Sequence, residues 1–282
     1  MYDKYIRRLE NSIISLYWKY KYYFRETRAL RRARHLYSCN YCIDEKEPLV
    51  SVYIPTYNRC ELLMDRAVDS VLRQNYRNFE LLIIGDHCTD NTEKIVSRIK
   101  DTRVSFFNIP NRGYRYPPTA ENHWYAGPVV AANTALDMVK GKWIARIDDD
   151  DVWTYDHLEK LLSKAIADNL EFISGSYLVY RNGMHEVVNP KDLSPSIGGT
   201  QTWLYRSYLK LFRYNINCWR KKWNRVNDMD LQDRMFKSGV KIGYIEDIIC
   251  EINPRPNEDE VGLKAYIAQE KKICNDLRFP DC

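Results

Sequence analysis

Four consecutive aspartates, residues 148–151, are the densest group of side chains in the sequence that could do chemistry. They directly follow an apolar run, residues 143–147, which a Lys-Gly turn signal precedes and which is predicted to be a buried strand. Ligands of open α/β sheets bind just beyond the carboxyl ends of strands, where these carboxylates would lie. Adjacent negative charges repel one another, and hard divalent ions such as Mg²⁺ bind carboxylate oxygens together with substrate phosphates. The run therefore predicts a divalent-metal site.

Two other interpretations of the acidic run come from its sequence context. Aspartate is a good N-cap and residues 155–167 are expected to be helical, so the run could be an acidic turn before a helix. A calcium loop of the EF-hand type would need a glycine at its sixth position, where Trp153 stands, and an oxygen ligand where Val152 stands. We reject the calcium loop, and the neighbouring strands decide between the other two interpretations.

The composition limits the class of protein. The chain has 282 residues, 45% of them hydrophobic, which suffices for one large domain or two small ones. It contains no apolar run near the roughly 20 residues that span a membrane, and no secretory signal. Eight cysteines without such a signal indicate a reducing, cytoplasmic compartment and free thiols. Cys39 and Cys42 form the only close pair, and we expect unpaired thiols there because no second Cys-x-x-Cys follows.

Residues 1–47 are expected to form a basic amphipathic helix and a polar linker. Residues 2–37 hold ten Lys and Arg against three acidic residues, and apolar side chains recur at helical spacing from Ile6 to Tyr20. A basic helix with aromatic residues can lie on an anionic membrane surface, which would make the protein peripheral through residues 1–38. Packing on the chain's own domain is an equal alternative, and nucleic acid is a much less favoured partner.

From residue 48 onward, short apolar runs alternate with helical patterns. The predicted strands are residues 49–54, 79–84, 103–109 and 143–147, and the predicted helices are residues 60–73, 90–100 and 128–139, with a loop at 111–127. This alternation predicts an α/β fold with a mostly parallel central sheet flanked by helices. No G-x-G-x-x-G or P-loop signature is present, which disfavours a dinucleotide-binding dehydrogenase and a Walker-type NTPase.

Polar side chains follow three of the predicted strands and should meet at one edge of the sheet. Tyr57, after the first strand, offers a stacking face for a base, and Asp86, after the second, an acceptor for a base N–H. Asp148 could accept from a ribose hydroxyl, while Asp150 and Asp151 suit a divalent ion that bridges a diphosphate. Each residue alone could form a turn, but their joint placement predicts a nucleotide-diphosphate site.

Four sequence segments resemble the family 2 glycosyltransferases, which have the GT-A fold. The segments are V-S-V-Y-I-P-T-Y-N-R, S-V-L-R-Q-N-Y-R-N-F-E-L-L-I-I-G-D-H-C-T-D-N-T, A-A-N-T-A-L and G-K-W-I-A-R-I-D-D-D-D-V-W. The resemblance covers about residues 48–252. It implies inverting transfer from a nucleotide-diphosphate sugar, with UDP-sugar favoured, to a hydroxyl of a glycan or glycolipid, with Mg²⁺ or Mn²⁺ as cofactor. It also implies a GT-A domain at 48–282, with a nucleotide-sugar half at 48–154 and an acceptor half with a C-terminal helix at 155–282.

The resemblance assigns roles to individual residues. Residues 148–150 match the D-x-D motif, in which Asp150 would be a metal ligand and Asp151 the following acid. The residues at the nucleotide would be Pro55, Thr56, Tyr57, Arg59, Asp86, Asp148 and Asp149. Residues 227–231 resemble the family's E-D-x-D-L segment, whose second residue is the general base, so this role falls on Asp228. The residues at the donor or acceptor sugar would be Asn133, Gly198, Gly199, Thr200 and Asn227.

Three departures from the family pattern define an alternative function. Asn227 stands where the family has Glu, and Asn133 ends an Ala-Ala-Asn triplet where the family has Ala-Arg-Asn, so Arg112 or Arg115 is expected to supply the missing contact. Residues 246–257 lack the late histidine that completes the family's metal shell. The alternative is a non-catalytic protein of the same fold that binds a nucleotide sugar or carbohydrate. The four retained aspartates, Asp148, Asp150, Asp151 and Asp228, favour the enzyme.

Overall fold

The computed structural model describes residues 2–37, 47–181, 183–220, 225–256, 258, 261–269, 271 and 275. Cys39 and Cys42 lie outside the described residues, as does most of the predicted linker. The cysteines within the described part, Cys60, Cys88, Cys218 and Cys250, are free thiols.

The strands of the described residues join into one sheet of nine strands, ordered β3-β2-β1-β4-β8-β6-β9-β5, with β7 beside β6. They are β1 Val50–Thr56, β2 Phe79–Gly85, β3 Val104–Asn108, β4 Trp143–Arg146, β5 Asp151–Trp153, β6 Phe172–Arg181, β7 Met184–Val188, β8 Leu204–Arg206 and β9 Ile242–Ile252. The first four strands pair in parallel, as predicted. In the second half only β6 and β9 are parallel, whereas β4–β8, β6–β8, β6–β7 and β5–β9 are antiparallel.

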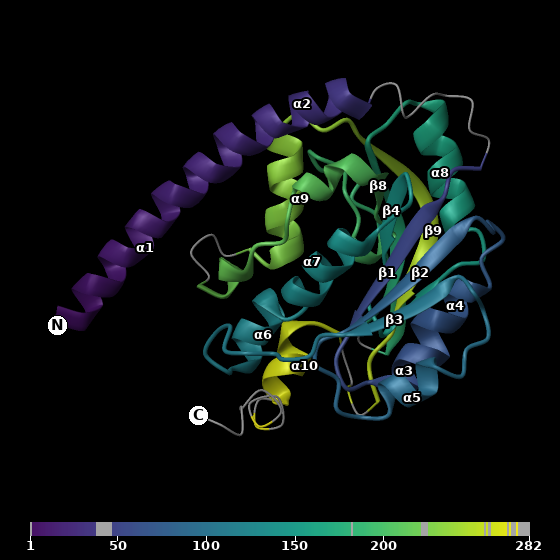
Figure 1. The fold of residues 1–282 in the computed structure, drawn as a ribbon, viewed down its shortest axis with the longest axis horizontal. Coiled ribbons are helices and arrows are strands. Elements are labelled where there is room, and N and C mark those ends of the chain that lie inside the picture. Colours follow the sequence, from purple (N-terminus) through teal and green to yellow (C-terminus); the bar gives the residue numbers. More distant parts are fainter. Residues whose placement is uncertain are drawn as a thin grey trace.

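Helices cover both faces of this sheet (Figure 1). They are α1 Tyr2–Tyr20, a π-helical turn Lys21–Glu26, α2 Thr27–Tyr37, α3 Cys60–Leu62, a π-helical turn Leu63–Val68, α4 Asp69–Leu72, α5 Thr92–Val96, α6 Ala120–Ala126, α7 Val129–Met138, α8 His157–Ala167, α9 Asn227–Lys237 and α10 Leu263–Ala268. Short 3₁₀ turns lie at Thr200–Thr202, Ser207–Leu211 and Ile216–Arg220. One apolar core joins α7, α9 and α2 to the sheet, and the other joins α4, α5 and α8 to the opposite face.

The predicted elements form where their apolar residues can be buried. Strand β1 is buried along its whole length, which explains its continuous apolar and β-branched sequence. Helix α8 buries Leu158, Leu161, Leu162 and Ala165, which recur at the three- and four-residue spacing of one helix face. The acidic run joins β4, the parallel neighbour of β1, to β5, which precedes α8.

Two expectations about local structure are wrong. The segment 111–127, expected to be a loop, contains α6, which Thr119 caps by accepting a hydrogen bond from the backbone N–H of Asn122. The prolines and glycines around α6 conceal this cap in the sequence. No strand was expected between the strand at 143–147 and the helix at 155–167, but Asp151 begins β5, which pairs with β9 more than 90 residues later. Such a long-range pairing leaves no local signal.

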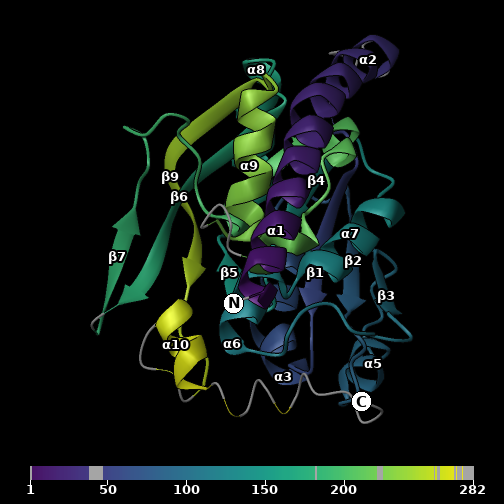
Figure 2. The same ribbon diagram turned by 90° about the vertical axis from the view of Figure 1, so that its left-hand side faces the viewer.

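The N-terminal helix runs from Tyr2 to Tyr37 through the π-helical turn, and only its later part packs on the domain. In α2, Leu30 and Ala33 are buried and Arg34 forms an ion pair with Glu171 (Nη2–Oε2, 2.5 Å). Helix α1 projects away from the sheet (Figures 1 and 2). None of the described helices is long and apolar enough to cross a membrane.

Candidate active site

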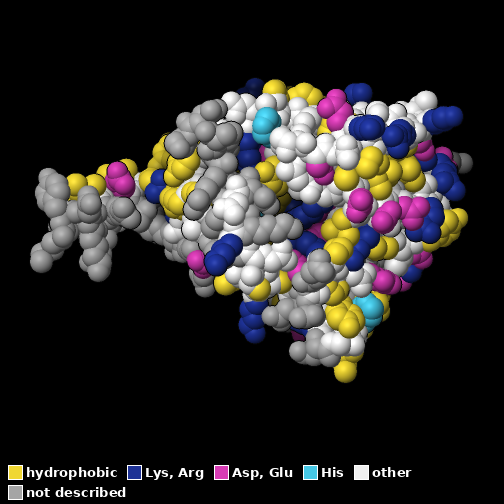
Figure 3. All heavy atoms as spheres, turned by 90° about the horizontal axis from the view of Figure 1, so that it is seen from below, with side chains coloured by type: hydrophobic (Ala, Val, Ile, Leu, Met, Phe, Trp, Pro, Cys, Tyr) yellow, Lys and Arg dark blue, Asp and Glu magenta, His cyan; other side chains and the backbone are white. Residues whose placement is uncertain are grey.

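The carboxyl ends of β1, β2 and β4 lie at one edge of the sheet because these strands are parallel neighbours in register. A pocket opens at this edge, and seen from below the face is hollowed where acidic and basic side chains meet (Figure 3). Eight residues predicted for the nucleotide and the metal line this pocket: Pro55, Thr56, Tyr57, Arg59, Asp86, Asp148, Asp149 and Asp150. The convergence expected from the strand ends is therefore present.

The first two aspartates of the run each contact a guanidinium. Asp148 Oδ1 accepts from Arg146 Nη2 at 2.7 Å, and Arg146 is buried at the end of β4. Asp149 is buried and points back toward β1, where its Oδ2 accepts from the Thr56 hydroxyl (2.8 Å) and its Oδ1 from Arg59 Nη1 (2.9 Å). Asp149 thus fixes the end of β1 against the acidic run, while Asp148 is the more exposed carboxylate of the two.

The last two aspartates have contrasting surroundings. Asp150 Oδ2 accepts from Arg255 Nε at 2.5 Å, and although burial opposes its ionisation, Arg255 and Arg59 lower the pKa of Asp150. Asp151 is buried at the start of β5, and burial together with the charges of the three preceding aspartates raises its pKa well above the usual range. Electrostatic repulsion within the run, expected from the sequence, is therefore concentrated on Asp151.

The acidic run fits a divalent cation by the chemistry of its donors. Asp148, Asp150 and Asp151 supply hard carboxylate oxygens, the ligands that Mg²⁺ and Mn²⁺ prefer. Arg255 already places one positive charge on Asp150. Asp148 and Asp150 line the pocket, whereas Asp151 is buried and is not part of its lining. Among the described residues no three His, Cys, Asp or Glu side chains are grouped so that they could hold a metal ion by themselves. An ion held here would take further ligands from a bound phosphate or water.

Arginines also define the opposite wall of the pocket. Arg115 forms a bidentate pair with Asp86, with both nitrogen–oxygen distances 2.7 Å. Arg112 lies 3.5 Å from the same carboxylate, and its guanidinium covers one face of the Tyr57 ring at 4.2 Å from the centroid. Both arginines expected to compensate for the Ala-Ala-Asn triplet therefore reach the wall formed by Tyr57 and Asp86.

Arg255 and Tyr266 also line the pocket, and neither was predicted from the sequence. Arg255 lies within the segment searched for a late histidine, and its side chain reaches the metal motif instead. Its Nη2 donates to the Tyr266 hydroxyl at 2.8 Å, and Tyr266 in α10 also packs edge-on against Trp124 of α6 at 5.0 Å. Arg66 holds this arrangement by donating to the backbone carbonyls of Asp150 (2.9 Å) and Pro254 (2.8 Å). No pattern in the sequence indicated that Arg255 would reach the pocket.

His123 also lines the pocket, as a neutral side chain. It lies in α6 and shares a hydrogen bond of 2.9 Å with the Tyr116 hydroxyl. Burial and the neighbouring arginines hold the pKa of His123 well below its usual range. It therefore adds no positive charge to the pocket at neutral pH.

The predicted general base lies on α9, beside the predicted sugar loop. Asp228 Oδ2 accepts from the Thr200 hydroxyl at 2.6 Å, and Thr200 opens a 3₁₀ turn directly after Gly198 and Gly199. A Cβ on Gly198 would lie 2.2 Å from the Gly175 carbonyl oxygen, so only glycine lets the loop approach β6 this closely. The N-cap of α9 is Val226, and Asp228 lies in the first turn. Asp228 Oδ1 accepts from the backbone N–H of Met229 at 2.8 Å, so this side chain also satisfies a donor at the start of the helix.

Neighbouring residues of the same segment are bound to other parts of the fold. Asp230 accepts from Arg234 Nε at 2.9 Å, the i,i+4 pair predicted for this helix. Asn227 is buried and donates to the Tyr125 carbonyl at 3.0 Å. Asn133 exchanges two hydrogen bonds of 2.9 Å with the backbone of Tyr214. The amides of Asn227 and Asn133 thus hold backbone segments, away from the pocket at the sheet edge.

Tyr214 connects the two groups of residues. The Arg146 guanidinium lies 5.2 Å from its ring centroid, and its hydroxyl lies 2.9 Å from that of Tyr53 in β1. Burial raises the pKa of Tyr214, Arg146 opposes this rise and Asp228 adds to it. Asp228 is therefore close enough to act electrostatically on Tyr214, which lies beside Arg146, the partner of Asp148.

Comparison with known proteins decides the family. Residues 51–225 match the family model described as Glycosyl transferase family 2, which is more than half of the chain. The chain belongs to glycosyl transferase family 2. A relative from Escherichia coli, UDP-Glc:alpha-D-GlcNAc-diphosphoundecaprenol beta-1,3-glucosyltransferase WfgD, is 34% identical over 134 residues, which cover 48% of this chain and 47% of WfgD. The chain thus matches about half the length of this curated relative.

Solved structures show the same fold in this family 2 chain. S. aureus TarS 1–349 in complex with UDP-GlcNAc has a TM-score of 0.58 and 16% identity, covering 74% of this chain and 60% of that one. The mannosyltransferase PcManGT from Pyrobaculum calidifontis, in complex with GDP-Man and Mn²⁺, has a TM-score of 0.54 and 17% identity, covering 82% and 68%. The predicted GT-A fold is thereby confirmed.

Proposed function

We propose that this family 2 chain is an inverting, metal-dependent glycosyltransferase that moves a sugar from a UDP-sugar to a hydroxyl of a glycolipid or glycan. The observation that carries the proposal is the pocket at the sheet edge, where Tyr57, Asp86 and the acidic run face one another. WfgD, by its name, transfers glucose from UDP-Glc to a diphosphoundecaprenol-linked sugar, and TarS was solved with UDP-GlcNAc. These names favour a UDP-sugar and a lipid-linked acceptor for this chain.

The donor would bind with its base at Tyr57 and Asp86 and its diphosphate at the acidic run. Arg59 and Arg255 lie at this end of the pocket and carry positive charge toward a diphosphate. Asp150 and Asp151 would hold Mn²⁺ or Mg²⁺, which stabilises the negative charge of a departing diphosphate. PcManGT contains Mn²⁺, in keeping with this assignment.

The acceptor would be activated from the α9 side. Inverting transfer needs a base that removes the proton of the acceptor hydroxyl as its oxygen attacks the anomeric carbon. Asp228 is the base in this proposal. Its carboxylate is held in place by the Thr200 hydroxyl, which donates to Oδ2 at 2.6 Å, and by the backbone N–H of Met229, which donates to Oδ1 at 2.8 Å. Gly198 and Gly199 would provide backbone close to the donor sugar without side chains in the way.

The N-terminal helix would bring this chemistry to a membrane. Ile13, Leu16, Tyr17 and Phe24 are exposed on the projecting half of the helix, and Arg25 is exposed beside them. Apolar side chains flanked by basic residues bind the headgroup region of anionic bilayers. We therefore place the enzyme on the cytoplasmic membrane surface, where lipid-linked acceptors would be present.

The competing function is a non-catalytic nucleotide-sugar or carbohydrate-binding protein. The test is release of UDP from UDP-glucose, measured with Mn²⁺ and again after addition of EDTA. The enzyme releases UDP with Mn²⁺ and stops with EDTA, whereas a binding protein is stabilised thermally by UDP-glucose but releases none. If UDP-glucose neither stabilises the protein nor turns over, the assignment of the donor is wrong.

A further inference from the structure

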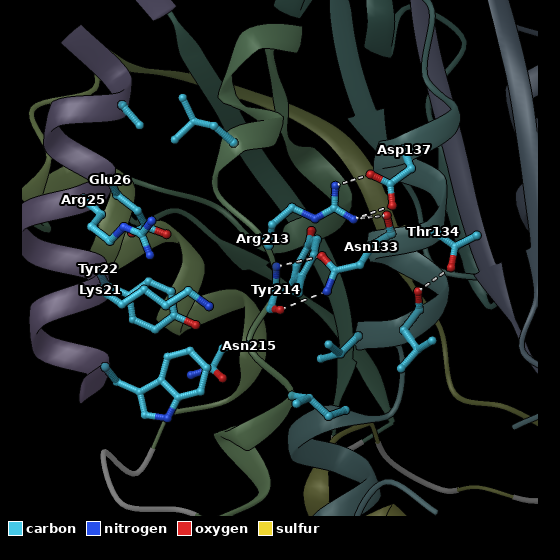
Figure 4. Close-up of a pocket in the computed structure, with 16 residues that line it drawn as sticks. Lys21, Tyr22, Arg25, Glu26, Asn133, Thr134, Asp137, Arg213, Tyr214 and Asn215 are labelled. Atoms are coloured by element: carbon cyan, nitrogen blue, oxygen red, sulfur yellow. Dashed lines mark hydrogen bonds and ion pairs between the residues drawn. The ribbon is translucent and has the colours of Figure 1, made fainter. Parts of the chain in front are cut away.

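A second cavity lies between the N-terminal helix and the domain (Figure 4). The helix contributes Trp18, Tyr22 and Glu26 from the end of α1 and the π-helical turn. The opposite wall comes from α7 and the segment after the 3₁₀ turn at 207–211, including Tyr214 and Asn215. Both walls carry aromatic or aliphatic surface with a few polar groups, the usual composition of a small-molecule site.

Three polar atoms of this cavity have no hydrogen-bond partner, and all three are shielded from water. They are the indole N–H of Trp18, Glu26 Oε2 and Asn215 Nδ2. The other ends of two of these side chains are held: Glu26 Oε1 accepts from Arg234 at 2.5 Å, and Asn215 Oδ1 accepts from the backbone N–H of Asn217 at 3.1 Å. Asn215 is 2% exposed and Glu26 8%. Buried polar groups are normally satisfied, so three orphans around one cavity indicate a missing ligand.

The orphan atoms specify the chemistry of that ligand. Two of them donate, and the third is a carboxyl oxygen that needs a donor. Hydroxyl groups both donate and accept, so a polyhydroxylated molecule could satisfy all three. Lys21 and Arg25 also line the cavity, and among the described residues no carboxylate lies within ion-pair distance of either. The Arg213 charge, in contrast, is taken by Asp137 at 2.6 Å. The positive charges of Lys21 and Arg25 therefore favour a ligand that carries an anionic group.

Tyr214 forms the wall between this cavity and the candidate active site. Its ring lines the cavity, while its other contacts are Arg146, the partner of Asp148, and the hydroxyl of Tyr53. Asp228 is also close enough to raise the Tyr214 pKa. A molecule bound in the cavity would therefore lie next to the acceptor side of the site.

We propose that this cavity is a remote acceptor subsite that binds the sugar-phosphate portion of a lipid-linked acceptor. The inference rests on the proposed function and adds where the acceptor is held. Trp18, Glu26 and Asn215 bond the sugar hydroxyls, and Lys21 with Arg25 binds the phosphate. Since the orphan atoms are shielded, the ligand enters as α1 shifts slightly outward about the π-helical turn. The exposed apolar stripe of α1 then lies toward the bilayer that holds the lipid chain.

The test is binding of N-acetylglucosamine 1-phosphate to the full-length protein by calorimetry, with UDP and Mn²⁺ titrated in parallel. Trp18→Phe removes the indole N–H and keeps a smaller aromatic ring beside Tyr22. Asn215→Asp keeps the acceptor for Asn217 while replacing the orphan donor. Each should weaken sugar-phosphate binding about two- to tenfold, the effect of one hydrogen bond, and leave UDP binding unchanged. Tyr20→Phe is the matched control on the same helix, because Tyr20 is exposed and does not line the cavity.

The outcomes separate this proposal from the proposed function. The subsite is supported if wild type binds the sugar phosphate, both variants bind it more weakly and Tyr20→Phe binds it as wild type does. Equal binding by wild type and both variants, or no binding at millimolar concentration while UDP binds, overturns it. Inorganic phosphate that binds as tightly as the sugar phosphate would show a simple anion site and also contradict the proposal. If the wild-type protein does not bind UDP, the donor assignment is wrong instead.

Discussion

At the scale of single residues, the acidic run is organised by arginines that are distant in the sequence. Asp148, Asp149 and Asp150 contact guanidiniums from three different segments, two of them far from the run. The sequence predicted the carboxylates because they follow a strand, but it could not predict Arg255 or Tyr266, which reach the pocket only through the path of the chain after β9. Burial and the three neighbouring carboxylates raise the pKa of Asp151, and a divalent cation beside the run would favour its ionised form.

The role of Asp228 is testable by substitution. Asp228→Asn should lower kcat by about 10²–10⁴-fold, the usual contribution of a general base, while the KM for UDP-sugar stays near that of wild type. Asp230→Asn should spare kcat and lower the melting temperature, because Asp230 pairs with the buried Arg234. Initial rates at saturating donor measure the first effect and thermal denaturation the second. If Asp230→Asn loses turnover at an unchanged melting temperature and Asp228→Asn keeps it, the base is Asp230.

At the scale of elements, the fold was predictable where burial dictates the sequence pattern. Strands β1, β2 and β4 are buried along nearly their whole length, so their apolar runs stand out. Helix α6 and strand β5 were missed because the first is capped inside a Pro- and Gly-rich segment and the second exists only by pairing with β9. The N-terminal helix was predicted as an element, but its periodicity gave no indication that α2 packs on the domain while α1 projects.

The anchor of the N-terminal helix should be sensitive to pH. Burial raises the pKa of Glu26 from 4.5 to about 7, although the adjacent Arg234 lowers it. The folded protein therefore keeps a proton that the unfolded chain loses above pH about 4.5. The stabilisation is complete below that pH and disappears as pH rises through about 7, a change of about 3 kcal/mol in the free energy of unfolding.

Glu26→Gln removes this titration and retains Oε1 as the acceptor for Arg234. As pH rises from 4.5 to about 7, the melting temperature of wild type should fall relative to that of the variant. Parallel curves for the two proteins would mean that Glu26 stays ionised and that its ion pair with Arg234 outweighs burial.

At the scale of the whole molecule, α1 projects from the domain and carries apolar side chains that the domain does not bury. Its apolar side chains stay exposed although they are spaced to form one face, and a solvated apolar stripe of this length commonly marks an interaction surface. The sequence left membrane binding and packing on the domain as equals. In the structure α2 packs on the domain and α1 is exposed, so packing is confirmed for the later half while membrane binding by α1 stays a prediction.

Membrane binding by α1 should depend on its apolar stripe. Ile13 and Leu16 are 64% and 68% exposed, so replacing both by Gln should leave the melting temperature unchanged. Co-sedimentation with phosphatidylglycerol vesicles should weaken about tenfold or more, since each buried aliphatic side chain contributes about 1.5–3 kcal/mol. Gln at Met184 and Leu193, which are equally exposed elsewhere, is the matched control. If the wild-type protein does not co-sediment with these vesicles at low salt, α1 does not dock on a membrane.

The central claim is that the pocket at the sheet edge binds a nucleotide diphosphate together with a metal, and titration calorimetry with UDP and Mn²⁺ tests it most directly. Wild type and Asp228→Asn should bind UDP with similar Kd, because the base contacts the acceptor and not the diphosphate. Asp150→Asn should weaken UDP binding in Mn²⁺ about tenfold or more, since it removes a charged ligand of the metal. EDTA should reduce wild-type binding to the level of Asp150→Asn. UDP binding that is equal in wild type and Asp150→Asn, and indifferent to EDTA, would contradict the account.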